Sequence, residues 1–258
     1  MARAAATGQA KATKAPAKPV RRARGSLSQE EILDGAYRVV AEEGLMALSM
    51  PALARELRAG VTSIYWYFRS KDDLLVALAE RVVQEVYSRM PPVGDGPWDE
   101  ELVRYFSAFR RELRRMPVFL QLFSMRPRFI ATRPHVFETL SRRLEDEVGV
   151  FVKLGLPPVE AARLYTACSV YTRGFVMLEH GYESELAAGD PAVLTNVVGD
   201  AVNRLDPAHY PVLSQLPDFA PFTLDDEQFA GGLQLLIAGI RSTAEAVAAR
   251  PAPRRKRS

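Results

Sequence analysis

The chain has 258 residues, 48% of them hydrophobic, which is long and apolar enough for one large or two modest folded domains. Its single cysteine, Cys168, excludes an internal disulfide and a cysteine-cluster metal site, and it favours a reducing compartment such as the cytoplasm. No apolar stretch reaches the roughly 18–20 residues of a membrane-spanning helix. No apolar segment follows the basic N-terminus, as one would in a secretory signal.

The net charge of +3 conceals an uneven distribution of charge. Residues 1–25 carry seven basic residues and residues 249–258 carry five, and neither segment holds an acidic residue. All 31 acidic residues lie in residues 26–248, together with 22 of the 34 basic ones. We predict a disordered basic arm at 1–25 and a disordered basic tail at 249–258. Such ends either contact a polyanion or only keep a chain in solution, and charge alone leaves both interpretations open.

Short-range signals predict four helices before the Pro91-Pro92 pair, which ends the fourth. The helix starts carry serines that can accept hydrogen bonds from the free N–H groups of a first turn: Ser28, Ser49 and Ser70. Glu31 completes a capping box with the first serine, and Gly44 ends that helix. The third helix is expected at about 61–68, after a turn at Arg58-Ala59-Gly60.

The rest of the chain also shows the 3.6-residue period of helices. The predicted segments are 98–116, 118–125, 134–154, 158–180, 191–205 and 225–249. No stretch combines strand alternation with turn chemistry. We therefore predict an all-α fold, with a small head at 26–87 and a larger body at 88–248.

Residues 49–68 form two short helices joined by a tight turn, the pattern of a helix-turn-helix motif. In such a motif the second helix enters the major groove with small, hydroxyl-bearing or aromatic side chains. Ile64 and Phe68 are predicted to face inward, which leaves five side chains for the groove and its walls: Thr62, Ser63, Tyr65, Trp66 and Tyr67. The alternative is a core helix with an aromatic stripe. It is disfavoured because three consecutive aromatic residues cannot all point into one core.

Three segments of the head resemble the TetR family of transcriptional repressors: SMPALAREL (49–57), SIYWYF (63–68) and SKDDLL (70–75). Residues 222–240 resemble the last helix of the body in the tetracycline-repressor-like branch. The resemblance implies a homodimer formed by the helices near 158–180 and 225–249. It also implies a palindromic double-stranded DNA operator, a small-molecule ligand that releases the repressor, and no cofactor. Several glycines inside these two helices suit close helix contact.

By the same resemblance, the DNA contacts fall on Ser49, Arg58, Thr62, Ser63, Tyr65, Trp66, Tyr67 and Lys71. Two positions depart from the family pattern. Arg58-Ala59 stands where Gly-Val is usual, and Pro51 replaces an arginine that reads a base, so the operator sequence is expected to differ. Because residues 26–72 hold five basic and seven acidic residues, we expect the arm to supply part of the attraction to DNA.

The resemblance places the ligand-lining positions of the body at Tyr87, Tyr105 and Phe109. No histidine corresponds to the family's magnesium ligand, and the three histidines, His135, His180 and His209, show no ligand spacing. We therefore expect a metal-free, apolar site for a hydrophobic or aromatic ligand. The alternative for these aromatic residues is ordinary core packing.

The sequence disfavours two other classes of function. An enzyme is disfavoured because the sequence shows no patterned nucleophile and base, no glycine-rich phosphate loop and no metal cluster. A scaffold protein that only keeps the helical fold is disfavoured by the Tyr-Trp-Tyr run and Lys71. Exposure of Thr62, Tyr65, Trp66 and Tyr67 discriminates between DNA binding and a scaffold. The sequence does not decide between repressor and activator.

Overall fold

The computed structural model describes residues 27–92, 94, 96–125, 134–188, 204–215 and 224–249. The predicted arm, residues 250–258 of the predicted tail and most of the predicted 191–205 helix lie outside these residues. The described part is helical and contains no strand, which confirms the predicted fold class. Its elements are α1 (Gln29–Glu43), α2 (Met50–Glu56), α3 (Val61–Tyr65), α4 (Lys71–Arg89), α5 (Trp98–Arg115), α6 (Pro117–Met125), α8 (Pro134–Lys153), α9 (Pro158–Ala188), the 3₁₀ turn η1 (Leu213–Gln215) and α11 (Asp226–Ala248).

Local sequence signals set the helix ends in the head. The Ser28 hydroxyl accepts from the Glu31 N–H at 3.1 Å, and the Glu31 carboxylate accepts from the Ser28 N–H at 2.9 Å, so the capping box is formed. Gly44 ends α1 with a φ of 87°, a conformation that favours glycine. The Ser49 hydroxyl caps α2 through the Ala52 N–H at 3.2 Å.

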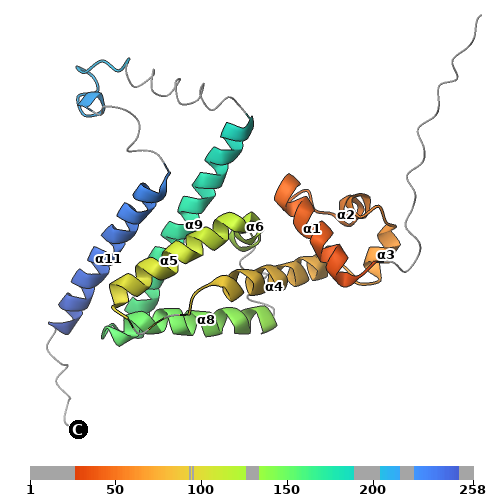
Figure 1. Cartoon of the computed structure of the whole chain (residues 1–258), viewed down its shortest axis with the longest axis horizontal. Helices are drawn as coiled ribbons and strands as arrows, with labels where there is room; N and C mark the ends of the chain where they lie inside the picture. The colour runs from red at the N-terminus through yellow and green to blue at the C-terminus, as the bar shows by residue number, and fades with distance from the viewer. Residues whose placement is uncertain are drawn as a thin grey trace, which may run out of the picture.

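Helix α4 connects the head to the body (Figure 1). Its N-terminal half packs with the head helices, and its C-terminal half lies among α5, α6 and α8. Buried side chains run along its length, from Leu74 and Leu78 to Val86. One hydrophobic core therefore continues from the head through α4 into the body.

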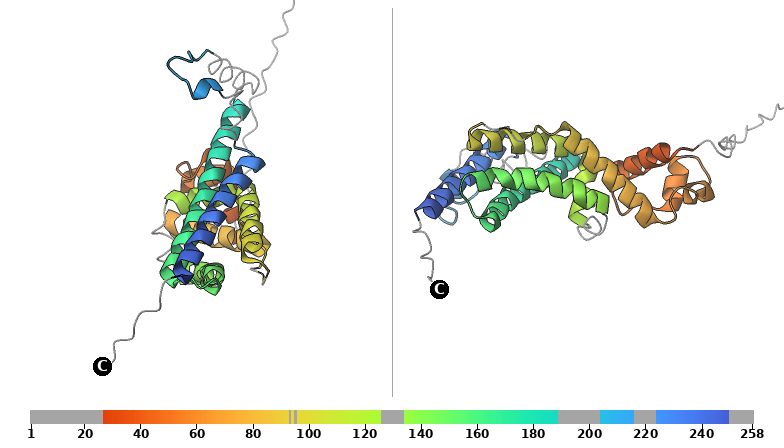
Figure 2. Two further views of the ribbon diagram at one scale, coloured as in Figure 1. Left: turned by 90° about the vertical axis from the view of Figure 1, so that its left-hand side faces the viewer. Right: turned by 90° about the horizontal axis from the view of Figure 1, so that it is seen from below.

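The body consists of α5, α6 and α8 packed against the long helix α9, with α11 alongside α9 and α5. In the left view of Figure 2, α9 and α11 lie side by side in front of the other helices. Helix α9 extends eight residues beyond its predicted end at residue 180. Gly181 does not end it, because one glycine lowers helix stability by only about 1 kcal/mol and no proline follows at once. No described helix is long and apolar enough to cross a membrane.

Candidate DNA interface and interior ligand site

The aromatic run after α3 forms an outward ridge on the head. Ile64 is fully buried and Phe68 nearly so, which fixes the inner face of this segment as expected. Trp66 is 81% exposed and Tyr65 is 47% exposed, and Thr62 is also exposed. The hydrophobic effect disfavours the exposure of large aromatic side chains. Their exposure here indicates a surface that contacts another molecule.

Tyr67 lies differently from its neighbours. It is half-buried, and its hydroxyl donates to the Leu27 carbonyl at the entrance to α1. The Trp66 ring meets the Tyr67 ring edge-on, with centroids 5.0 Å apart. Tyr67 thus anchors the ridge to the start of α1, and a direct DNA contact by this side chain stays a prediction.

The remaining predicted DNA contacts surround the ridge. Ser63 is half-buried in the first turn of α3, and the Ser49 hydroxyl is engaged in capping α2. Lys71 is the first residue of α4, where helix N–H groups and a cation can meet a phosphate together. Among the described residues, Arg58, Arg69 and Lys71 form no ion pair, whereas Arg38 is paired with Glu56 at 2.7 Å. The sequence analysis did not name Arg69 as a candidate phosphate contact, although its position directly before Ser70, the N-cap of α4, indicates this.

The turn between α2 and α3 holds Arg58 in the left-handed region, with a φ of 51°. The Arg58 N–H donates to the Arg55 carbonyl at 3.1 Å, and the Ala59 N–H donates to the Ala54 carbonyl at 2.9 Å. This is the bonding pattern of a Schellman C-cap, whose left-handed residue is usually glycine. The chain therefore keeps a tight turn despite the Arg58-Ala59 departure, and the backbone of Arg58 is strained.

Replacing Arg58 with glycine is expected to raise the thermal unfolding midpoint by about 1–3 °C. Relief of the left-handed backbone contributes about 1–2 kcal/mol, which exceeds the extra chain entropy of glycine, about 0.5–1 kcal/mol. Differential scanning calorimetry of the full chain checks this. The control is Arg55→Gly, because Arg55 lies within α2 and the same change there should lower the midpoint. A decrease of similar size in both variants would contradict the strain at Arg58.

The three predicted ligand-lining residues meet in one aromatic cluster inside the body. The Tyr105 and Phe109 rings are stacked with centroids 6.3 Å apart, and Phe109 meets Phe119 of α6 edge-on at 6.3 Å. Tyr87, near the end of α4, meets the same Phe119 ring at 6.4 Å. All four side chains are buried. The cluster therefore joins α4, α5 and α6 at one point.

A polar centre lies beside these rings, whereas the sequence predicted an apolar site. Glu147 of α8 is buried, the Tyr105 hydroxyl donates to its carboxylate, and Tyr165 lines the same small void. Burial raises the pKa of Glu147, although its interactions with Tyr105 and Tyr165 oppose the shift. Burial, together with the nearby Glu147 carboxylate, also raises the pKa of Tyr105. Sequence reasoning missed Glu147 and Tyr165, because their approach depends on how α8 and α9 pack.

The interior is closed around the polar centre. A void of about 10 Å³ lies between Tyr105, Glu147, Phe151 and Tyr165, which is the size of one water molecule. A drug-sized ligand needs roughly 300–1,000 Å³. Any such ligand must therefore separate α5, α8 and α9 in order to enter here.

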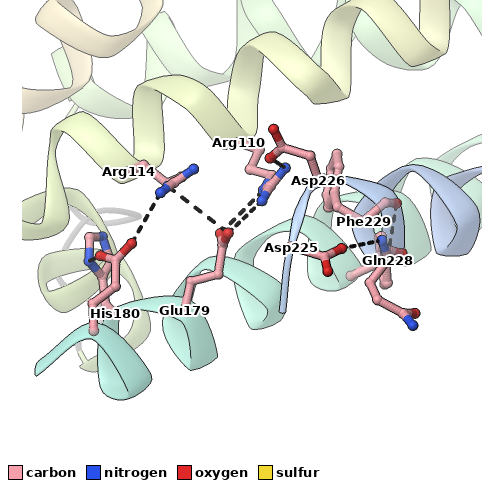
Figure 3. Close-up of polar contacts among 10 residues, drawn as sticks. Arg110, Arg114, Glu179, His180, Asp225, Asp226, Gln228 and Phe229 are labelled. Atoms are coloured by element: carbon pink, nitrogen blue, oxygen red, sulfur yellow. Dashed lines mark hydrogen bonds and ion pairs between the residues drawn. The ribbon is translucent and has the colours of Figure 1, made fainter. Parts of the chain in front are cut away.

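A second buried polar group fastens α5 to α9 and α11 (Figure 3). Two guanidinium nitrogens of Arg110 donate to Glu179 of α9, and a third bond reaches Asp226 of α11 at 2.7 Å. The guanidinium also lies 5.2 Å from the Phe175 ring centroid and 4.7 Å from that of Phe229. Movement of α5 is therefore coupled to both α9 and α11.

Family models match both parts of the chain. Residues 32–78 match the model of bacterial regulatory proteins of the tetR family, and residues 90–244 match that of the tetracyclin repressor-like C-terminal domain. The chain belongs to the TetR family. It is accordingly a DNA-binding transcriptional regulator and not an enzyme, as the sequence predicted.

Individual TetR-family relatives are similar over most of their length. The transcriptional repressor Rv1353c of Mycobacterium tuberculosis is 34% identical over 77% of this chain and 74% of its own. The class C tetracycline repressor of Escherichia coli is 24% identical over 83% of this chain and 90% of its own. Among solved structures, ActR of Streptomyces coelicolor in complex with actinorhodin is 26% identical. It superposes with a TM-score of 0.65 and covers 84% of this chain and 98% of its own.

The described part of this TetR-family chain holds no group of three or more His, Cys, Asp or Glu residues that could bind a metal ion. His180 lies on α9, His209 lies in the turn before η1, and the side chain of His135 lies outside the described residues. The histidines that the structure describes therefore point to no metal site.

Proposed function

We propose that the chain is a homodimeric repressor that binds a palindromic DNA operator in the cytoplasm, at the nucleoid, and is released by a small aromatic ligand. The exposed ridge of Thr62, Tyr65 and Trp66 carries this proposal. It lies on the short helix of a helix-turn-helix motif, directly before the α4 N-terminus that carries Lys71. A scaffold protein would have no reason to expose Trp66 at this place. Repression is favoured over activation because the similar Mycobacterium tuberculosis protein is named a repressor.

In this proposal α3 lies in the major groove, with Thr62, Tyr65 and Trp66 toward base edges and thymine methyl groups. Arg58 and Lys71 contact phosphates on the two sides of the groove, and Ser49 and Ser63 bind the backbone through hydroxyl or N–H groups. Tyr67 positions the ridge through Leu27.

An apolar stripe on α9 and α11 supports the proposed dimer. Val170 and Leu178 on α9 and Leu235 on α11 are exposed, and they lie at helical spacing with small residues. An added Cβ at Gly174, Gly231 or Gly239 would meet nothing within 4 Å, so contacts inside the subunit do not explain these glycines. Gly232 differs, because Tyr171 occupies the place of its Cβ and explains it within the subunit. We propose that the corresponding face of a second subunit covers the stripe.

The ligand site we propose is the aromatic cluster with its polar centre. The ActR structure with bound actinorhodin supports a small-molecule site in this architecture. Two contacts connect the cluster with the head. Arg143 of α8 donates to the Tyr87 carbonyl at the end of α4 at 2.9 Å. Gln121 of α6, two residues after Phe119, accepts from the Leu45 N–H at 2.8 Å. A ligand that separates α5, α8 and α9, and with them α6, would therefore shift α4 and the α1–α2 turn, changing the distance between the two heads of a dimer.

Replacing Gln121 with alanine is expected to speed hydrogen exchange of the Leu45 amide about 10-fold. The variant leaves a partly buried N–H without its acceptor, a loss of about 1–3 kcal/mol. Hydrogen–deuterium exchange resolved by residue checks this. The Ala47 amide is the internal control, because it donates to Gly44 at 3.1 Å within the same turn. Unchanged exchange at Leu45 would rule out Gln121 as the connection between α6 and the head.

The proposed function is tested by selecting random duplex DNA with the purified full chain at two salt concentrations. An enriched palindrome, with affinity that falls steeply as salt rises, is the expected result. Binding without enrichment would mean that the basic ends act alone and would overturn sequence-specific regulation through α3.

A further inference from the structure

Two buried polar atoms on α9 have no hydrogen-bond partner among the described residues. Ser169 is 2% exposed, and its hydroxyl has no hydrogen-bond partner in the described part of the protein. The same holds for the buried Nε of Arg173, one turn further on, and no described residue forms an ion pair with this guanidinium. Tyr165, one turn before Ser169, lines the void beside Glu147. Residues spaced by four lie on one helix face, so Ser169 lies between Tyr165 at the polar centre and Arg173 beside Phe109.

The neighbours of Arg173 place it at the aromatic cluster. Its guanidinium carbon lies 6.0 Å from the centroid of the Phe109 ring, which stacks with Tyr105. Glu147 is near enough to interact with Arg173 through its charge, but it forms no ion pair with it, and the Tyr105 hydroxyl donates to its carboxylate instead. Arg143 is the other cation near this centre, and it is bound to the Tyr87 carbonyl and lies over the Tyr87 ring.

Arg173 is half-buried. Its buried Nε–H and the buried Ser169 hydroxyl, both without a partner, are unfavourable for folding alone, because buried polar groups are normally hydrogen-bonded. Two such groups on adjacent turns make a donor pair, with Nε–H and the other guanidinium N–H groups from Arg173 and O–H from Ser169. Donors of this kind suit a carboxylate or phenolate oxygen, and a planar guanidinium binds a carboxylate in two-point fashion. Stacked aromatic side chains directly beside them suit a flat ring system.

We propose that Arg173 and Ser169 bind the anionic group of a planar aromatic ligand, an aromatic carboxylic acid or an acidic phenol, whose rings lie against Phe109 and Tyr105. This inference rests on the proposed ligand-regulated function and names the chemistry of its ligand. The ligand keeps the aromatic character expected from the sequence and adds a negative charge. Arg173 then determines specificity between acidic aromatic compounds and neutral ones of the same shape.

The test uses two probes of equal size, anthraquinone-2-carboxylate and the uncharged anthraquinone-2-carboxamide, titrated calorimetrically into the full chain. The wild type is expected to bind the carboxylate about 10- to 100-fold more tightly than the amide. Arg173→Met should reduce carboxylate affinity to that of the amide and leave amide binding within about 3-fold, and the retained amide binding shows that the variant folds. Ser169→Ala should cause a smaller loss, confined to the carboxylate. Arg163→Met, on the same helix but at an exposed arginine paired with Glu160, should leave the preference unchanged.

The inference is overturned if the wild type binds neither probe, shows no preference for the carboxylate, or keeps its preference in Arg173→Met. The same proteins are also assayed on the selected DNA. Arg173 lies in the body, so Arg173→Met should bind DNA as the wild type does. If Arg173→Met loses the carboxylate preference and still binds the selected DNA, both proposals are supported. A wild type that prefers the carboxylate but selects no DNA sequence would overturn the proposed function and leave the anion site standing.

Discussion

Replacing Trp66 with alanine is expected to lower operator affinity about 30-fold or more. In the proposed dimer each head loses one groove contact of about 1–3 kcal/mol, and two heads together lose about 2–6 kcal/mol. The thermal unfolding midpoint should change little, because the side chain is 81% exposed and its removal leaves no cavity. Fluorescence anisotropy with the selected operator measures the affinity, and calorimetry measures the midpoint.

Met46→Ala is the matched control for this prediction. Met46 is 77% exposed in the turn after α1, so it is another large apolar side chain on the surface of the head, away from α3. The control should bind the operator as the wild type does. Equal affinity of the wild type and Trp66→Ala would refute α3 as the reading helix, whereas equal losses in both variants would point to a general effect on the head.

The parts of the head that the sequence predicted are those set by neighbouring residues. Ser28 and Glu31 are three positions apart, so a capping box follows from the chain itself, and the burial of Ile64 and Phe68 follows from helical spacing. Tyr67 shows where this reasoning stops. Its hydroxyl bonds to Leu27, 40 residues earlier, and no local pattern indicates that partner.

The interior site was predictable only in part. Family resemblance predicted Tyr87, Tyr105 and Phe109 as one site, and in the structure Tyr87 and Phe109 meet Phe119 while Tyr105 stacks on Phe109. The resemblance gave aromatic positions and so predicted an apolar site, whereas the charged groups come from α8 and α9. Glu147 meets Tyr105, and Arg173 meets Phe109, only when these distant helices pack against α5. The fold determines which atoms of Glu147 and Arg173 find hydrogen-bond partners, and the spacing of residues in the sequence gives no information about this.

The Arg110 ion pairs suggest how the ligand site and the proposed dimer face are connected. Arg110 directly follows Phe109 of the aromatic cluster, and its bonds reach Glu179 on α9 and Asp226 at the start of α11. Both of these helices carry the exposed apolar stripe. A change at the cluster can therefore reach the dimer face through α5 without any contact between ligand and partner subunit.

Replacing Leu235 with aspartate is expected to convert the proposed dimer to monomers. Leu235 is 77% exposed in the isolated subunit, so the charge is tolerated there. At a two-fold interface it would be buried twice, at about 2 kcal/mol or more for each copy. The dimer dissociation constant should rise about 1,000-fold or more. Sedimentation velocity over a concentration series measures it.

Operator binding should fail together with dimerisation, because a palindrome is read by two heads and a monomer keeps only half of the contacts. Leu144→Asp is the control, since Leu144 is exposed on α8, outside the α9–α11 stripe, and should leave both properties intact. A Leu235→Asp protein that stays dimeric would place the interface elsewhere. A monomeric variant that kept wild-type operator affinity would instead contradict recognition by two heads, while leaving the α9–α11 interface in place.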